Sequence, residues 1–211
     1  MTLLHAIALH PAARNEDRAV VVAQHGSLVI AVADGAGGMP GGAEAADIVI
    51  AATLRAALGV RDERDIAQLL SAIDAECASS PRAGESTGIV MLVRDDGTIV
   101  GASAGDSEAW LIDEIGVVRL TEHQARKRHL GGGTASPTPF RGVLAPTATL
   151  VIGTDGLFGY AAREAVIEAA SAGDVHSCAQ ALLAAALAPP VVLADDLAVV
   201  VVRRAGDQLP P

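Results

Sequence analysis

Short aliphatic or alternating runs, bounded by turn residues, recur along the whole chain and predict β-strands. The runs cover residues 3–9, 18–23, 28–33, 88–93, 99–104, 109–112, 117–120, 148–152 and 197–203. The segments His25-Gly26-Ser27 and Asp95-Asp96-Gly97 have the composition of tight turns, and each would join two strands into a hairpin. Hairpin connections imply antiparallel sheets.

Apolar residues at helical spacing predict four helices, arranged in two pairs that separate the groups of strands. The first pair begins near Ala43 and continues through 66–77, with Asp62 as N-cap of its second helix; the second pair covers 163–170 and 174–187. Each pair needs a sheet face on which to bury its apolar stripe. We therefore predict an α+β fold, a four-layer α-β-β-α sandwich of two mainly antiparallel sheets packed face to face with a helix pair outside each.

The chain shows no internal repeat and no linker, so residues 1–211 are predicted to form a single domain. Residues 121–147 are polar, basic and rich in glycine, and we predict a mobile, flap-like surface segment there. Residues 203–211 form a short tail that ends in proline.

Composition narrows the classes of function. Hydrophobic residues make up 51% of the chain but aromatic residues only 2%, and the formal net charge is −10. A nucleic-acid partner is not expected, because both a basic surface and a base-stacking platform are lacking. No uninterrupted apolar stretch is long enough for a membrane span, and no signal peptide is evident. Cys77 and Cys178 are isolated, which predicts reduced core thiols and a cytoplasmic protein.

Three acidic motifs carry the candidate chemistry. Asp34, Asp155 and Asp195 each follow a hydrophobic run, at 28–32, 150–152 and 191–193. A carboxylate at the mouth of a buried strand is costly unless a positive group meets it, and three together would form an oxygen-only pocket for hard divalent cations. Gly35 would let the backbone approach such an ion with its carbonyl. Taken singly, each Asp-Gly pair is also typical of a simple turn.

The ordered set of motifs resembles the PP2C-type (PPM) metal-dependent protein serine/threonine phosphatases. The matching motifs are Asn15-Glu16-Asp17-Arg18, Val32-Ala33-Asp34-Gly35-Ala36-Gly37-Gly38, Ser86-Thr87-Gly88, Ala104-Gly105-Asp106-Ser107, Arg119-Leu120-Thr121-Glu122-His123, Gly153-Thr154-Asp155-Gly156-Leu157-Phe158 and Asp195-Asp196-Leu197-Ala198-Val199-Val200. Each motif is weak alone, but their order runs through nearly the whole chain.

The resemblance implies a site with two divalent cations, Mn²⁺ or Mg²⁺, and assigns a role to each matching residue. Asp34 would bridge both ions, the Gly35 carbonyl would bind one ion, and Asp155 and Asp195 would hold the other. The catalytic set would be Asp34, Asp155 and Asp195. Glu16 and Asp17 would order coordinated water, Asp106 would bind a weaker third metal, and Asp196 would lie behind the ligands.

The implied activity is hydrolysis of phosphoserine and phosphothreonine on proteins by metal-activated water, without a covalent intermediate. The partner would be a phosphorylated protein, and the enzyme would oppose a serine/threonine kinase.

Several positions depart from the family's pattern. Ala12 stands where relatives carry a phosphate-binding arginine, so Arg14, two residues before Glu16, is the candidate for that role. Ala36 replaces a histidine found in some relatives, Glu108 replaces an arginine, and the flap-like segment is short. These departures keep two alternatives open: a weak or inactive phosphatase-like module that binds a phosphoprotein or regulatory partner, and a hydrolase of small phosphorylated metabolites.

His123 and His129 flank a basic run, residues 126–128, within the flap-like segment. A solvated surface is one interpretation. The other is a rim of the site that attracts phosphate in an otherwise acidic protein.

Overall fold

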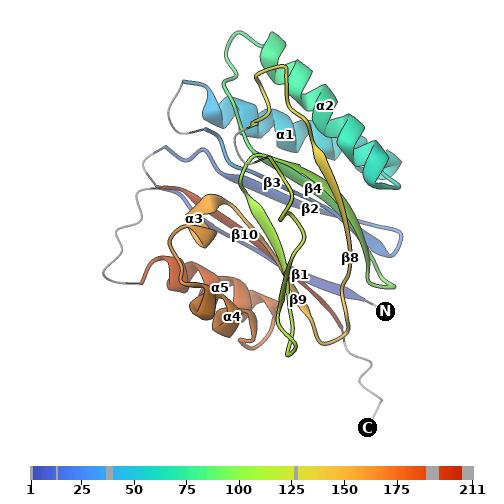
Figure 1. Ribbon diagram of the computed structural model, residues 1–211, viewed down its shortest axis with the longest axis vertical. Coiled ribbons are helices and arrows are strands. Elements are labelled where there is room, and N and C mark those ends of the chain that lie inside the picture. Colours follow the sequence, from blue (N-terminus) through green and yellow to red (C-terminus); the bar gives the residue numbers. More distant parts are fainter. Residues whose placement is uncertain (1, 13, 37–39, 126–127, 189–194, 206–211) are drawn as a thin grey trace.

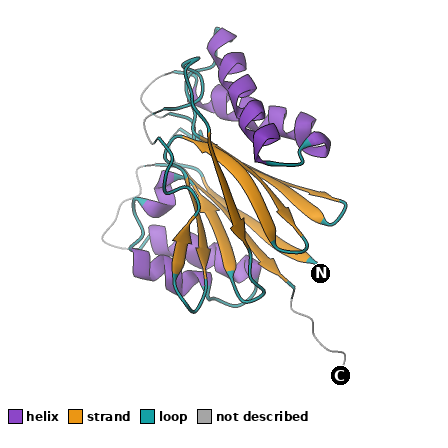
Figure 2. Ribbon diagram, turned by 45° about the vertical axis from the view of Figure 1, so that its right-hand side comes forward, coloured by secondary structure: helices purple, strands orange, loops and turns teal. Residues whose placement is uncertain are grey.

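The computed structural model describes residues 2–12, 14–36, 40–125, 128–188 and 195–205. Within them, two five-stranded antiparallel sheets pack face to face (Figures 1 and 2). In spatial order, one sheet consists of β1 (Leu3–His10), β10 (Leu197–Arg204), β9 (Thr149–Gly153), β6 (Glu108–Ile112) and β7 (Val117–Arg119). The other consists of β2 (Arg18–Gln24), β3 (Ser27–Ala33), β4 (Gly88–Arg94), β5 (Thr98–Ala104) and β8 (Thr138–Val143).

Helices cover the outer face of each sheet (Figure 1). Over the β2–β8 sheet lie α1 (Gly42–Ala56), the short 3₁₀ helix η1 (Ala57–Gly59) and α2 (Glu63–Ser79). Over the other sheet lie α3 (Asp155–Phe158), α4 (Arg163–Ala170) and α5 (Val175–Ala186). The predicted α+β fold, the four-layer α-β-β-α sandwich, is confirmed.

Strand β10 shows why central strands of this fold are continuously aliphatic. Val199 and Val201 pack toward α4 and α5, whereas Val200 and Val202 pack into the core between the two sheets. Both faces of the strand are therefore buried, and every position favours an apolar side chain. The hydrophobic layers are built from small aliphatic residues, in keeping with the low aromatic content.

The local turn and cap predictions are also confirmed. His25 and Gly26 form the β2–β3 turn with positive φ angles of 34° and 77°. The Asp62 carboxylate caps α2 by accepting hydrogen bonds from the backbone N–H groups of Arg64 and Asp65. No helix in the described part of the chain is long and apolar enough to cross a membrane.

No strand was predicted within the flap-like segment 121–147, and this is wrong, because β8 (Thr138–Val143) lies inside it. This strand pairs with β5 at the edge of its sheet, and Phe140 lies over Gly101, where a Cβ atom would come within 2.3 Å of the ring. Pro139 and the mostly exposed neighbours of Phe140 weaken the strand pattern, as is common on edge strands. At the other end of the chain, β10 continues through Arg204, and residues 206–211 of the predicted tail lie outside the described residues.

The topology brings the acidic motifs to one end of the sandwich. Asp34 follows β3, Asp106 lies just beyond β5, Asp155 follows β9, and Asp195 comes shortly before β10. The antiparallel register pairs Gly88 at the start of β4 with Ala104 at the end of β5. The hydrophobic run 191–193 that was expected to lead into Asp195 lies outside the described residues.

Candidate metal centre

The carboxylates of Asp34, Asp106 and Asp155 converge at this end of the sandwich. One oxygen from each lies within 4.8 Å of the oxygens of the other two. With Asp195 they line a cavity of about 240 Å³. The remaining lining residues are Ala36, Thr87 and His129. Four of the carboxylates singled out in the sequence thus share one cavity.

A network of buried hydroxyl groups holds Asp34 in place. Its backbone N–H donates to Thr87 Oγ1 at 3.1 Å, and its carbonyl accepts from the Thr87 N–H at 2.7 Å and from Ser86 Oγ at 2.9 Å. Thr87 Oγ1 also lies 2.7 Å from Ser107 Oγ, beside Asp106. The ends of β3, β4 and β5 are therefore tied together directly behind the carboxylates.

Gly35 occupies a position that no side chain could fill. A Cβ atom there would come within 2.4 Å of the Gly42 backbone at the start of α1. The Gly35 N–H donates to the Glu16 carbonyl at 3.3 Å. The backbone after Asp34 is thus packed tightly between the Glu16 segment and α1, as expected of a glycine required by close approach.

Burial and mutual repulsion raise the pKa values of the clustered carboxyl groups. Burial raises the pKa of Asp34 to about 10, and the nearby charges of Asp17 and Asp155 add to the shift. Burial raises the pKa of Asp17 to about 7, against the effect of a hydrogen bond from Thr154. Burial also raises the pKa of Asp155, together with the charges of Asp195 and Asp106.

This donor set fits divalent cations. The lining residues include no lysine or arginine, so protein cations do not neutralise the clustered carboxylates. Asp17 Oδ2 is buried and has no hydrogen-bond partner among the described residues. Hard cations bind carboxylate and carbonyl oxygens and reverse the local electrostatics. Asp34, Asp155 and Asp195, the Gly35 carbonyl and Asp106 are the groups that would hold them.

Asp196 anchors the segment that carries Glu16 and Asp17. Its Oδ1 accepts from the N–H groups of Ala12 at 2.5 Å and Asn15 at 3.1 Å, and its Oδ2 accepts from the Glu16 N–H at 2.5 Å. The side chain is only 3% exposed. Its carboxylate is thus occupied by backbone N–H groups, and its place behind the metal ligands stays a prediction.

Arg14 lies outside the residues that line the cavity. Its side chain is 58% exposed, and Nη1 lies 4.0 Å from Glu16 Oε2. Burial raises the pKa of Glu16, while the charge of Arg14 opposes the shift. The phosphate-binding role of Arg14 stays a prediction.

Two residues gain importance from the structure. His129 lines the cavity, which favours the second of the two sequence interpretations. Asp74, on α2, accepts hydrogen bonds from the N–H groups of Gly131, Gly133 and Ala135 and so holds the segment that follows His129. The sequence could have indicated the role of Asp74, because this carboxylate lies on the apolar stripe of α2, four residues after Leu70.

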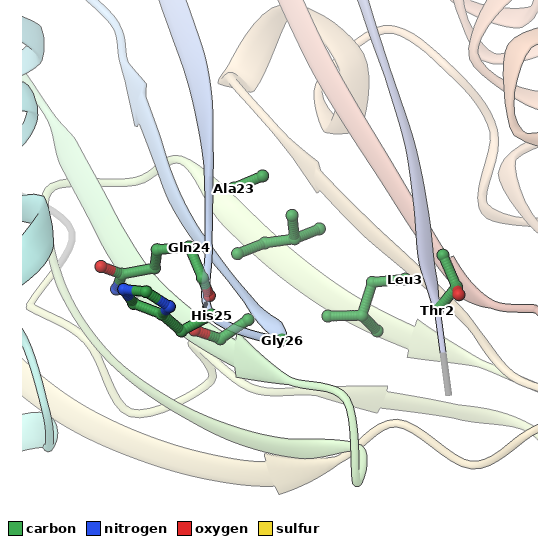
Figure 3. A pocket seen from close by; sticks show the side chains of 8 residues that line it. Thr2, Leu3, Ala23, Gln24, His25 and Gly26 are labelled. Carbon is green, nitrogen blue, oxygen red and sulfur yellow. Dashed lines mark hydrogen bonds between the residues drawn. The ribbon is translucent and has the colours of Figure 1, made fainter.

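A second hollow, of about 350 Å³, lies at the opposite end of the sandwich (Figure 3). It opens between the start of β1 and the β2–β3 turn, where Leu3 faces Gln24 and His25. Its lining residues include no carboxylate side chain. Among the described residues, the one group of three or more side chains placed to hold a metal ion is Asp34, Asp106 and Asp155 in the acidic cavity.

The fold and the carboxylate cavity place the protein in the class of PPM-type phosphatase domains, as the motifs indicated. The chain belongs to the SpoIIE family: the family model described as Stage II sporulation protein E matches residues 24–205. A search of curated protein sequences finds no match.

Solved structures of phosphatases share this fold at low sequence identity. A bacterial serine phosphatase superposes with a TM-score of 0.84 at 17% identity, over 97% of this chain and 99% of that one. The photosystem II phosphatase PBCP gives 0.79 at 20% identity, over 96% and 99%. The PPM Ser-Thr phosphatase MsPP from Mycobacterium smegmatis gives 0.72 at 19% identity, over 97% and 99%.

Proposed function

We propose that this protein is a metal-dependent phosphatase that hydrolyses phosphoserine and phosphothreonine on proteins. The observation that carries the proposal is the cluster of Asp34, Asp106 and Asp155 in a cavity lined by no lysine or arginine. Membership of the SpoIIE family and the fold shared with serine phosphatases support the same reaction.

Mn²⁺ or Mg²⁺ would be held by Asp34, Asp155, Asp195 and the Gly35 carbonyl, with Asp106 available for a weaker third ion. Divalent cations in such a site lower the pKa of water and offset the charge of a phosphoryl group. Glu16 and Asp17 would orient water beside them. The chain supplies rigidity, because Thr87 and Ser86 lock Asp34 and Asp196 locks the Glu16 segment.

The proposed partner is a phosphorylated protein produced by a serine/threonine kinase. With a formal net charge of −10, the protein repels phosphate at long range, so we expect substrate binding to depend on the bound cations. Cys77 and Cys178 are both buried free thiols, and we propose that the enzyme works in the reducing cytoplasm.

The test is hydrolysis of a phosphoserine peptide, p-nitrophenyl phosphate and a sugar phosphate in Mn²⁺, Mg²⁺ or EDTA. We expect metal-dependent turnover of the first two, its loss in Asp155→Asn, and its retention in Asp47→Asn, an exposed aspartate on α1. A clear preference for the sugar phosphate would instead assign the enzyme to small metabolites.

Arg14 motivates the alternative function, a weakly active or inactive module that binds a phosphoprotein or regulatory partner. Its side chain faces Glu16 rather than the cavity lining. Folded wild-type protein that binds Mn²⁺ but turns over none of the three substrates would establish this alternative and overturn the enzymatic proposal.

A further inference from the structure

His129 reaches the metal-site cavity from a segment with no part in the acidic motifs. It lines the cavity together with Asp34, Asp106, Asp155 and Asp195. Its side chain is 25% exposed, and Nδ1 lies 3.5 Å from Glu85 Oε2. Nδ1 thus faces the Glu85 carboxylate, which leaves Nε2 as the nitrogen available to a ligand.

The backbone that follows His129 is fixed at two points. Leu130 is fully buried and exchanges two backbone hydrogen bonds with Ser86, at 2.9 and 2.8 Å. The Ser86 hydroxyl in turn donates to the Asp34 carbonyl at 2.9 Å. Beyond Leu130, the buried Asp74 carboxylate accepts from the Gly131 N–H at 2.7 Å and the Gly133 N–H at 2.9 Å. His129 is therefore held at a set position relative to Asp34, unlike a histidine on a solvated loop.

The other groups of the cavity are poorly suited to donate a proton once cations are bound. Four are aspartates that would be ionised ligands, and Ala36 contributes only a methyl group. The Thr87 hydroxyl is already engaged with the Asp34 N–H and with Ser107. Cleavage of a serine or threonine phosphoester releases an alkoxide, a poor leaving group that needs a proton.

We propose that His129 is the proton donor to the departing serine or threonine oxygen, an assignment that rests on the proposed phosphatase function. The oxygen of water forms the new P–O bond, and the P–O bond to the amino-acid oxygen breaks with its electron pair. That oxygen takes the proton from His129 Nε2. The proton lost by water passes to solvent, and solvent reprotonates the imidazole before the next turnover. Glu85 keeps the ring oriented.

The test compares two leaving groups. The p-nitrophenolate ion leaves without a proton, whereas a serine alkoxide does not. We expect His129→Ala to lower kcat on a phosphoserine peptide by about 100-fold and kcat on p-nitrophenyl phosphate by less than about threefold. His123→Ala is the matched control, since this histidine flanks the same basic run and is exposed; both activities should stay unchanged.

Equal losses on both substrates, or no loss on either, would overturn the assignment. A loss that accompanies weaker Mn²⁺ binding in calorimetry would also overturn it, because His129 would then act through the metal. If His129→Ala fails to fold, Glu85→Gln is the substitute variant. We expect it to lower kcat on the phosphoserine peptide by about tenfold and to leave kcat on p-nitrophenyl phosphate unchanged. Wild-type activity separates the two proposals: an inert wild type overturns both, whereas an active wild type with no leaving-group split overturns only the role of His129.

Discussion

Two sets of aspartates in this protein, one buried and one half-buried, differ in what surrounds their carboxylates. Asp74 and Asp196 are 5% and 3% exposed, and each accepts three backbone N–H hydrogen bonds. Asp34 and Asp155 are surrounded by other carboxylates, which raise their pKa values further beyond the effect of burial. The first set is satisfied by backbone N–H groups, whereas the second set is surrounded by like charges that a bound cation would offset.

The two sets have complementary tasks. Asp196 anchors Ala12, Asn15 and Glu16, and Asp74 anchors Gly131, Gly133 and Ala135. The satisfied carboxylates therefore hold two segments close to the cavity. The clustered carboxylates lower the stability of the folded protein, and they create a strong negative field at one point. We infer that the anchors make the framework rigid enough to keep like charges together.

The largest expected effect is that of Asp34→Asn on activity. Loss of the ligand proposed to bridge both cations should lower kcat/KM by about 10³-fold or more, which corresponds to about 4 kcal/mol. The same substitution replaces a carboxyl group that must take up a proton on folding at neutral pH, so the protein in EDTA should become more stable. Enzyme kinetics and urea denaturation measure the two effects. A less stable Asp34→Asn protein in EDTA would contradict the division into two sets.

The anchors should behave in the opposite way. Asp74→Asn and Asp196→Asn each place an amide against N–H donors, and we expect the free energy of unfolding to fall by about 3 kcal/mol, with or without Mn²⁺. Urea denaturation measures this change, with the exposed Asp47→Asn as control. An anchor variant as stable as the wild type would show that the flanking segments are held by other contacts.

The pH dependence of the metal-free protein should sharpen the comparison. Asp34 and Asp17 have pKa values of about 10 and about 7, above the unfolded value of 3.8, so the folded state binds more protons than the unfolded state. The stability that these groups contribute is complete below pH 3.8 and is lost as the pH rises toward 7 and beyond. In EDTA each such group should lower the free energy of unfolding by at most about 1.4 kcal/mol per pH unit.

Denaturation in EDTA between pH 5 and 7 measures this slope. Asp34→Asn should reduce it, and saturating Mn²⁺ should also reduce it, because bound cations hold the carboxylates ionised. Subtracting the curve of the variant from that of the wild type removes titrations common to both. Identical slopes for the wild type and Asp34→Asn in EDTA would contradict the conclusion that the charges of the clustered carboxylates are not compensated by the protein.

The strands and the acidic motifs could be predicted from the sequence because both depend on local patterns. Continuous valine and isoleucine runs identify strands buried on both faces, and the order of Asp34, Asp106, Asp155 and Asp195 identifies the cavity. Strand β8 could not be predicted, because Phe140 alone marks its buried face and its stability comes from pairing with β5.

The position of His129 depends on long-range pairing. Leu130 and Ser86 are 44 residues apart, and their backbone hydrogen bonds, together with those that Asp74 accepts, hold the histidine at the cavity. Nothing in the spacing around His129 indicates this pairing. Arg14 presents the converse case: the sequence placed it near the site, but its side chain pairs with Glu16 outside the cavity lining.

The smallest effect is expected at Asp62, an exposed carboxylate that is satisfied in the same way as the anchors. Backbone hydrogen bonds from Asp65 and then Arg64 lower its pKa, the opposite direction to that of Asp34. Its contribution is therefore present above the unfolded value of 3.8 and is lost as the pH falls. Asp62→Ala should lower the unfolding midpoint at pH 7 by about 2 °C, and Asp62→Asn, which still caps the helix, by less. If both substitutions lowered the free energy of unfolding as much as Asp74→Asn does, burial would not be the difference between a helix cap and an anchor. The N–H donors alone would then set how much each aspartate bonded to backbone N–H groups contributes to stability.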